Sequence, residues 1–490
     1  MGIVINQSIK NTIITYFGFG IGAINALFLY TIFLGKLHYG IVVFVISAGN
    51  IMMPLMSFGV QNTLIRFYSK YNSESERDNF LLLMLLMPLS LIILAIVLLY
   101  FFYHQISFLV LYENPNLAPF LWLIPLVGIF MGYFEIFYAW VKVHFQSVFG
   151  NFLSEVVTRV IVLFLLFFVS QNRLQKDTFV YSIVAVYGFQ CFSMMVYAMR
   201  VKRPVFKFQL PKNTKEIVSY SLFIIASGTV SVMLFDFDKV IIPVYQNISN
   251  NAFYSVAVFI AMVIAVPSRA MMQIIYPVTA QLLNENKLEE LNVLYKKSAI
   301  NLQVFGGLIM LCIFLNCKEL YQLIPKEYSG GIAVVFLIGL SKFYDLIIGN
   351  NAAIILNTKY YRWFLFFSIV LIAIMIVLYM FLIPIYGIVG AALATLIAVI
   401  IYNTIKLLFV FWKMNLFPFT IKTVYSFGII SLVFLMFYFW DFTFHPILNI
   451  VFKSILITIV YGLLNYKLKI SIEINQILDK LKAKYSNINN

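Results

Sequence analysis

The sequence predicts an all-α polytopic membrane protein with about fourteen transmembrane helices. Its mean hydropathy is +0.95, and 62% of its 490 residues are hydrophobic whereas only 11% are charged. A soluble chain could not cover so much apolar surface. No segment alternates like the strands of a barrel, and backbone polar groups in lipid must be satisfied within their own segment. The spans are therefore expected to be α-helices.

Apolar runs of about 20 residues, the length that crosses a bilayer core, recur along the whole chain. We expect spans at 12–34, 41–65, 80–103, 119–140, 150–170, 179–199, 217–245, 252–283, 298–317, 330–355, 363–382, 388–412, 423–440 and 447–465. The connectors on the side of the two termini contain 23 Lys and Arg residues, and the opposite connectors contain 5. Because basic connectors stay in the cytoplasm, both termini are expected to be cytoplasmic.

The most basic connector, "RVKRPVFKFQLPKNTKE" (200–216), divides the spans into two groups. We expect an N-lobe at 1–199 and a C-lobe at 217–412, each of six helices. Two further helices follow at 413–465, and a basic cytoplasmic tail at 466–490. A weak repeat supports the division, because Tyr39 and Pro54 of span two correspond to Tyr254 and Pro267 of span eight. Duplicated halves are typical of alternating-access transporters.

The residue patterns of common enzymes and metal sites are missing. The sequence contains no HExxH and no GxxxxGK[ST], so we expect neither zinc hydrolysis nor nucleotide hydrolysis. The three cysteines lie in apolar runs and are expected to be core residues without a disulfide. The net charge of +15 is concentrated in the cytoplasmic connectors, so we expect membrane lipids rather than nucleic acid as partners. We predict no enzymatic activity and no cofactor.

Charged residues within the spans are the candidate functional residues, because a charge at mid-membrane costs about 2.5–3.5 kcal/mol on insertion scales. Helical spacing pairs Glu155 with Arg159 at i,i+4, and pairs Asp236 with Lys239 and Lys342 with Asp345 at i,i+3. Two further charges, Asp238 and Arg269, have no local partner and need one on another helix or in water. Those near span ends, Glu135, Lys406 and Lys453, are expected to reach the membrane surface.

Two interpretations of these charges stay open. The pairs could be structural ion pairs that lock helices together, or they could line a hydrated cavity. We favour the cavity, because packing alone seldom requires charges in both lobes. The buried bases outnumber the acids, which suits an anionic ligand. Prolines within spans would bend helices and open space between the lobes.

Three motifs resemble those of bacterial polysaccharide-export flippases, the O-antigen or oligosaccharide branch of the superfamily that also contains the multidrug-and-toxin extruders. They are "FLGKLHYGIVVFVISAGNIMMPLMSFGVQNTLIRF" (33–67), "DKVIIPVYQNISNNAFYSVA" (238–257) and "LIPIYGIVGAALATLIA" (382–398). The resemblance implies two six-helix lobes in a V-shape around a cation-lined cavity, with alternating access. It also implies a polyprenyl-pyrophosphate-linked oligosaccharide as substrate and other polysaccharide assembly proteins as partners, in a bacterial cytoplasmic membrane.

Matched by position, the resemblance assigns the charged pair of span seven to Asp238 and Lys239, and the arginine that ends span two, a cytoplasmic gate, to Arg66. Arg159, Lys239, Arg269 and Lys342 are then the candidate substrate-binding cations. The candidate coupling or ion-pair carboxylates are Glu155, Asp236, Asp238 and Asp345. A proton or a sodium ion is the expected coupling ion. Pro243 and Tyr245 depart from the family pattern, and span one lacks a cation, which argues against the peptidoglycan-precursor subfamily.

Three other functions are compatible with parts of the sequence. A cation-coupled drug antiporter of the same fold would need a cavity dominated by acids. A membrane glycan polymerase would need a long outer loop with clustered catalytic side chains, and the sequence has none. A scaffold without transport activity would not need charges within its spans.

Overall fold

The computed structural model describes residues 2–203, 209–211, 213–440, 444–476 and 479, and the elements that it assigns there are all helical. Two compact units form, residues 1–255 and 256–490, and α10 begins in the first and ends in the second. Parts of the predicted basic linker (204–208 and 212) and most of the predicted tail lie outside the described residues. The predicted lobe boundaries stay a prediction.

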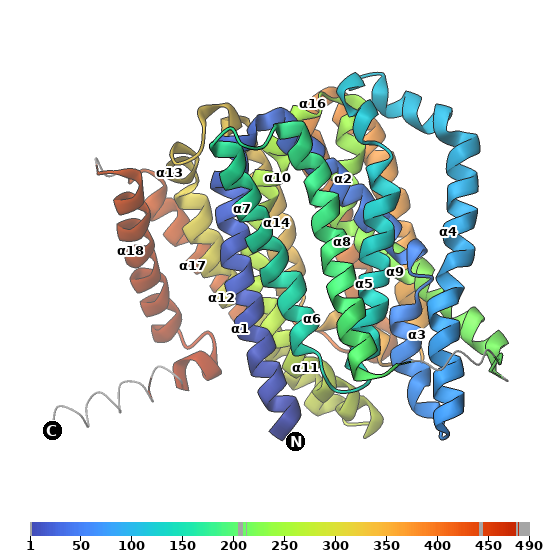
Figure 1. Ribbon diagram of the computed structural model, residues 1–490. Coiled ribbons are helices and arrows are strands. Elements are labelled where there is room, and N and C mark those ends of the chain that lie inside the picture. The colour runs from blue at the N-terminus through green and yellow to red at the C-terminus, as the bar shows by residue number, and fades with distance from the viewer. Residues whose placement is uncertain (1, 204–208, 212, 441–443, 477–478, 480–490) are drawn as a thin grey trace. The chain divides into compact units, whose positions relative to one another are not determined.

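The first unit contains nine α-helices, short 3₁₀ segments and two π-helical segments, η1 and η4, within the described residues (Figure 1). Its main helices are α1 (Gly2–Ile24), η1 (Asn25–Leu34), α2 (Gly35–Met56), α3 (Val60–Phe67), α4 (Glu74–Leu111), α5 (Leu123–Lys142), α6 (Val148–Phe152), η4 (Leu153–Val157), α7 (Thr158–Ser170), α8 (Lys176–Val201) and α9 (Thr214–Tyr245), with α10 (Ser249–Met262) beginning here. α2 packs against α5 and α9, and α5 also packs against α8.

The second unit is built from the later helices of the chain. They are α11 (Val266–Asn284), α12 (Leu288–Leu315), α13 (Cys317–Gln322), α14 (Ile332–Ile347), α15 (Asn351–Leu356), α16 (Tyr361–Met414), α17 (Ile421–Tyr438) and α18 (Pro446–Lys467). α14 packs against α12 and α16, while α17 and α18 pack against each other and against α12. The two predicted C-terminal spans are therefore present as α17 and α18.

Eleven described helices are long and apolar enough to cross a membrane, and α9, bent by 53°, makes a twelfth. Two of them, Lys10–Met56 with 47 residues and Tyr361–Met414 with 54, would be about 70 and 80 Å long if straight, more than twice a bilayer core. Each contains a glycine with non-helical angles, Gly35 (φ 77°, ψ 168°) and Gly387 (φ 57°, ψ −135°). The described residues thus contain 11 or 12 candidate spans, and counting each of these two long helices as two crossings would give the fourteen that the sequence predicts.

Two predicted spans are interrupted near their prolines. Span two breaks after Met56, where Phe58 and Gly59 adopt φ of 53° and 62° before α3 begins. A Cβ at Gly59 would lie 2.8 Å from the Ser221 carbonyl oxygen of α9, so glycine also permits a close approach there. Span eight is divided by a short 3₁₀ segment that ends two residues before Pro267. Proline removes a helical N–H and clashes with the preceding turn, which explains why the regular α-helix is interrupted near these residues.

Two glycines bring α1 against the segment that carries Glu155 and Arg159. A Cβ at Gly18 would lie 2.3 Å from the Glu155 carbonyl oxygen, and a Cβ at Gly22 would lie 3.3 Å from Cδ and Nε of Arg159. Small residues four apart allow such close helix packing in membranes. The GFGIGA segment therefore positions the Glu155–Arg159 pair.

Gly18→Ala is expected to destabilise the protein by about 1–3 kcal/mol, because the added methyl group overlaps backbone that cannot move freely. Gly20→Ala is the matched control, since nothing lies within 4 Å of its Cβ position. The measurement is the unfolding temperature of the purified protein in detergent. Equal unfolding temperatures for the two variants would contradict the packing described for α1.

Candidate functional site

A buried ion pair on α9 is the first part of the candidate site. Lys239 Nζ lies 2.8 Å from Asp236 Oδ1 and also donates to the Phe235 carbonyl oxygen at 3.0 Å. The two side chains are 15% and 14% exposed. The i,i+3 spacing predicted this pair. Because both charges are largely removed from water, each depends on its partners for stability.

Two polar residues of α2 complete the shell of Asp236. Ser47 Oγ donates to Oδ1 at 3.0 Å, and Asn50 Nδ2 donates to Oδ2 at 3.1 Å. The carboxylate thus accepts three hydrogen bonds from side chains and is held between α2 and α9. Lys239 has three N–H donors, and among the described residues it uses them only toward Asp236 and Phe235, which leaves one donor.

Asp238 has different surroundings from Asp236, two residues away. It is 6% exposed and accepts a 2.5 Å hydrogen bond from the Tyr254 hydroxyl of α10. Tyr254 is therefore the partner on another helix that the sequence left open. Pro243 leaves the Lys239 carbonyl without a helical donor, and Asn251 Nδ2 donates to that oxygen at 2.9 Å. These contacts tie the end of α9 to the start of α10.

A second ion pair lies at the junction of η4 and α7. Arg159 Nη2 is 2.9 Å from Glu155 Oε2, and the side chains are 32% and 28% exposed. Arg159 Nη1 is buried and has no hydrogen-bond partner among the described residues. The main chain is fixed by Asn25, whose Nδ2 donates to the Arg159 carbonyl oxygen at 2.8 Å. The guanidinium therefore keeps donors that its carboxylate partner does not use.

Tyr187 of α8 lies within electrostatic range of Arg159 of one pair and of Asp236 of the other. We call Glu155, Arg159, Asp236 and Lys239 the charged cluster. It contains two acids and two bases, so the excess of bases expected from the sequence is not found within it. The cluster can hold an anion only through the donors that Arg159 and Lys239 have left.

The other predicted cations lie elsewhere. The Arg66 guanidinium of α3 is exposed and lies 4.2 Å from the centre of the Tyr220 ring, at the first turns of α9. Nearby, Lys70 and Glu216 form an exposed ion pair at 3.1 Å. Arg269 is an exposed residue of α11, and Lys342 is a partly buried residue of α14. The roles of Arg66, Arg269 and Lys342 stay predictions, as does the pairing of Lys342 with Asp345.

The expectation that Lys406 and Lys453 reach the membrane surface is wrong. Their exposed fractions are 5% and 2%, so both are buried in the second unit. Lys406 lies seven residues before Lys413 of the same helix, about two turns inside it, which is deep for a side chain that must reach the surface. That depth, together with the polar residue Asn403 one turn earlier, was the signal in the sequence that could have identified Lys406 as a buried residue.

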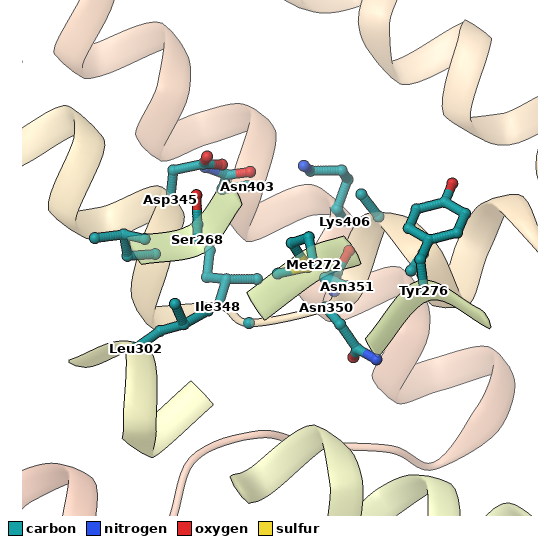
Figure 2. A pocket seen from close by; sticks show the side chains of 14 residues that line it. Ser268, Met272, Tyr276, Leu302, Asp345, Ile348, Asn350, Asn351, Asn403 and Lys406 are labelled. Carbon is teal, nitrogen blue, oxygen red and sulfur yellow. The ribbon is translucent and has the colours of Figure 1, made fainter. Parts of the chain in front are cut away.

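Lys406 lines a cavity of ≈ 210 Å³ in the second unit, which we call the Lys406 pocket (Figure 2). Polar residues of α11, α14, α15 and α16 also contribute, among them Ser268, Asp345, Asn351 and Asn403. Asn403 Nδ2 donates to Asp345 Oδ1 at 2.9 Å. Of the predicted site residues, Asp345 is the one that lines this pocket.

The described residues contain no cluster of three metal-ligating side chains, and the three cysteines form no disulfide. The candidate chemistry is therefore that of ion pairs, amides and hydroxyls.

Comparison with known proteins identifies a family and a fold. A family profile described as "Polysaccharide biosynthesis protein" matches residues 5–283, more than half of the chain. A solved structure described as lipid II flippase MurJ in an inward closed conformation is similar with a TM-score of 0.75 and 16% identity, covering 94% of this chain and 99% of that one. A second similar structure is described as a multidrug resistance MATE family transporter of the MOP superfamily in an inward-facing conformation. Its TM-score is 0.57 at 12% identity, and the match covers 82% of this chain and 94% of that one. Comparison with curated proteins gave no match. At these identities the two structures show the fold alone, and they confirm the predicted fold class.

Proposed function

This chain belongs to the polysaccharide biosynthesis protein family, and from that premise we propose that it flips a polyprenyl-pyrophosphate-linked oligosaccharide across the bacterial cytoplasmic membrane. It would do so by alternating access, with both termini in the cytoplasm, and serve the assembly of O-antigen, capsule or exopolysaccharide. The family match and the fold of a multi-pass membrane transporter support this proposal.

The charged cluster is the observation that carries the proposal to a mechanism. A pyrophosphate needs several charge-assisted hydrogen bonds, and guanidinium groups are well suited to give them. The buried Arg159 Nη1 and the third donor of Lys239 are available for this purpose. Glu155 and Asp236 hold the two cations in place, and Ser47 and Asn50 fix Asp236.

The charges of the cluster also bear on energy coupling. Two acids and two bases cancel, so a bound pyrophosphate leaves an excess of negative charge at a place with little water. A proton on one carboxylate, or a sodium ion beside it, would offset that excess. The membrane potential also acts on the charge of the lipid-linked substrate as the substrate crosses the membrane.

Complementation tests the proposal. A host that lacks its own flippase and has a known surface polysaccharide is given this chain, and surface glycan is stained. Lys239→Ala and Arg159→Ala are each expected to lower surface glycan about tenfold or more, because each removes charge-assisted hydrogen bonds to the pyrophosphate. Arg173→Ala, an exposed cation in the connector before α8, is the matched control and should leave export unchanged.

Arg269→Ala asks in the same assay whether the exposed arginine of α11 takes part. Full export by Lys239→Ala and Arg159→Ala, at wild-type protein levels, would overturn the role of the charged cluster. Resistance to cationic drugs without surface glycan would favour the antiporter, the second function considered for this fold.

A further inference from the structure

The Lys406 pocket contains a buried ammonium group for which the described residues provide no hydrogen-bonding partner. Lys406 is 5% exposed, yet among the described residues its ammonium forms no hydrogen bond and no ion pair. Its close neighbour is the Tyr402 ring, with the centre 4.0 Å from Nζ. A cation–π contact supplies only part of what a buried ammonium loses when it leaves water.

A carboxylate and two amide side chains, those of Asp345, Asn351 and Asn403, also line the cavity. Figure 2 shows the Lys406 side chain pointing toward Asp345 and Asn403 from the other side of the pocket. Because a carboxylate can only accept, the Asn403 amide nitrogen must donate to Asp345. The Oδ1 atom of Asn403 is then buried without a partner among the described residues. Asn351 donates to the Tyr295 hydroxyl at 2.9 Å, and its Oδ1 is likewise without a partner. Asn350 points away in Figure 2 and donates to Thr279.

This arrangement discriminates between classes of ligand. An anion would satisfy Lys406 but would face the Asp345 carboxylate. A cation would satisfy that carboxylate but would face the Lys406 ammonium. A ligand with several hydroxyl groups satisfies both sides, because each hydroxyl donates to one oxygen and accepts from the ammonium at the same time.

The volume limits the size of such a ligand. Pockets for drug-sized ligands measure about 300–1,000 Å³. The ≈ 210 Å³ of the Lys406 pocket is smaller, which fits one sugar ring and not an oligosaccharide. Tyr276 also lines the pocket and offers a ring against which the apolar face of a sugar can pack.

We infer that the Lys406 pocket binds one neutral sugar unit of the glycan head, with Lys406 and Asp345 as its hydrogen-bonding groups and Asn351 and Asn403 in its wall. The inference rests on the proposed function for the identity of the glycan. By the predicted topology these residues lie in the cytoplasmic halves of their spans, the side from which the substrate would enter. Charged and sugar-binding groups would then lie in different units of the chain.

Ligand-observed NMR on the full-length protein in detergent tests the inference. The probes are a neutral methyl hexoside, a uronic acid and inorganic phosphate, measured separately and in competition. We expect the neutral glycoside to bind, and Lys406→Met to weaken it about tenfold through loss of a charged hydrogen-bond donor. Lys453→Met is the matched control, because it removes another buried lysine of the same unit that does not line the pocket.

Lys406→Met should fold, because an apolar side chain of similar length replaces an unpaired buried charge. Asp345→Asn, at an exposed position, gives a second variant and should also weaken the glycoside. Stronger binding of uronic acid or phosphate than of the neutral glycoside would overturn the inference, and so would a pocket that takes no probe.

The same experiment separates this inference from the proposed function. Glycoside binding needs no transport, and Arg173→Ala, the exposed control of the export assay, should leave it unchanged. Glycoside binding in a protein that exports no glycan in any host would overturn the proposed function and support the pocket. Export with no effect of Lys406→Met on glycan or on glycoside would overturn the pocket alone.

Discussion

Asp236→Ala is expected to abolish glycan export and to destabilise the protein by about 3–5 kcal/mol, the usual cost of leaving one partner of a buried ion pair alone. Lys239 would remain 85% covered without its carboxylate, and Ser47 and Asn50 would lose their acceptor. The measurements are surface glycan after complementation and the unfolding temperature of the purified protein. Asp177→Ala is the control, because this carboxylate is 67% exposed in its pair with His38 and should have little effect.

A double variant separates structure from function at this pair. Asp236→Ala with Lys239→Met removes both charges, so stability should largely return, since replacing a whole buried pair by apolar groups is often neutral. Export should stay absent, because the cation needed for pyrophosphate is gone. If stability and export both returned, the pair would be a structural lock, the alternative that the sequence left open.

Asn114→Ala is expected to have the second large effect, a loss of several kcal/mol of stability. Asn114 is 2% exposed, and its side chain binds one backbone group in the last turn of α9 and two that follow the helix. Its Nδ2 donates to the carbonyl oxygens of Pro243 and Gln246 at 2.7 and 2.9 Å, and its Oδ1 accepts from the Ile248 N–H at 2.6 Å. Each buried backbone group left without a partner costs about 1–3 kcal/mol.

The unfolding temperature measures this effect, and Asn116→Ala is the matched control, because Asn116 is exposed and lies two residues away. Since the three bonds hold the end of α9 and the turn before α10, the Asp236–Lys239 pair should lose order as well. Equal stability of the two variants would show that these contacts carry little free energy.

Local spacing in the sequence was sufficient for the ion pairs. Residues three or four apart share a helix face, so Asp236 with Lys239 and Glu155 with Arg159 followed from the sequence and are found at 2.8 and 2.9 Å. The snorkelling expected for Lys406 failed, because spacing does not say which side of a helix faces protein.

Contacts between segments far apart in the chain could not be predicted from the sequence. Ser47 and Asn50 lie 189 and 186 residues from Asp236, and no local pattern relates them. The hydroxyl of Tyr254 reaches Asp238 only because the chain turns between α9 and α10. The Lys406 pocket requires five helices to meet, α11, α12, α14, α15 and α16, and a cavity is a property of their packing.

By itself, the sequence determined the class of the protein, its spans and the resemblance to its family, because the length and polarity of each segment follow from the bilayer alone. The tertiary structure decided which charges are satisfied and which keep donors free. Burial and hydrogen bonding depend on neighbours far apart in the chain. Those neighbours bury Asp238 with a hydrogen bond from Tyr254, and they leave Lys406 as a candidate ligand-binding residue.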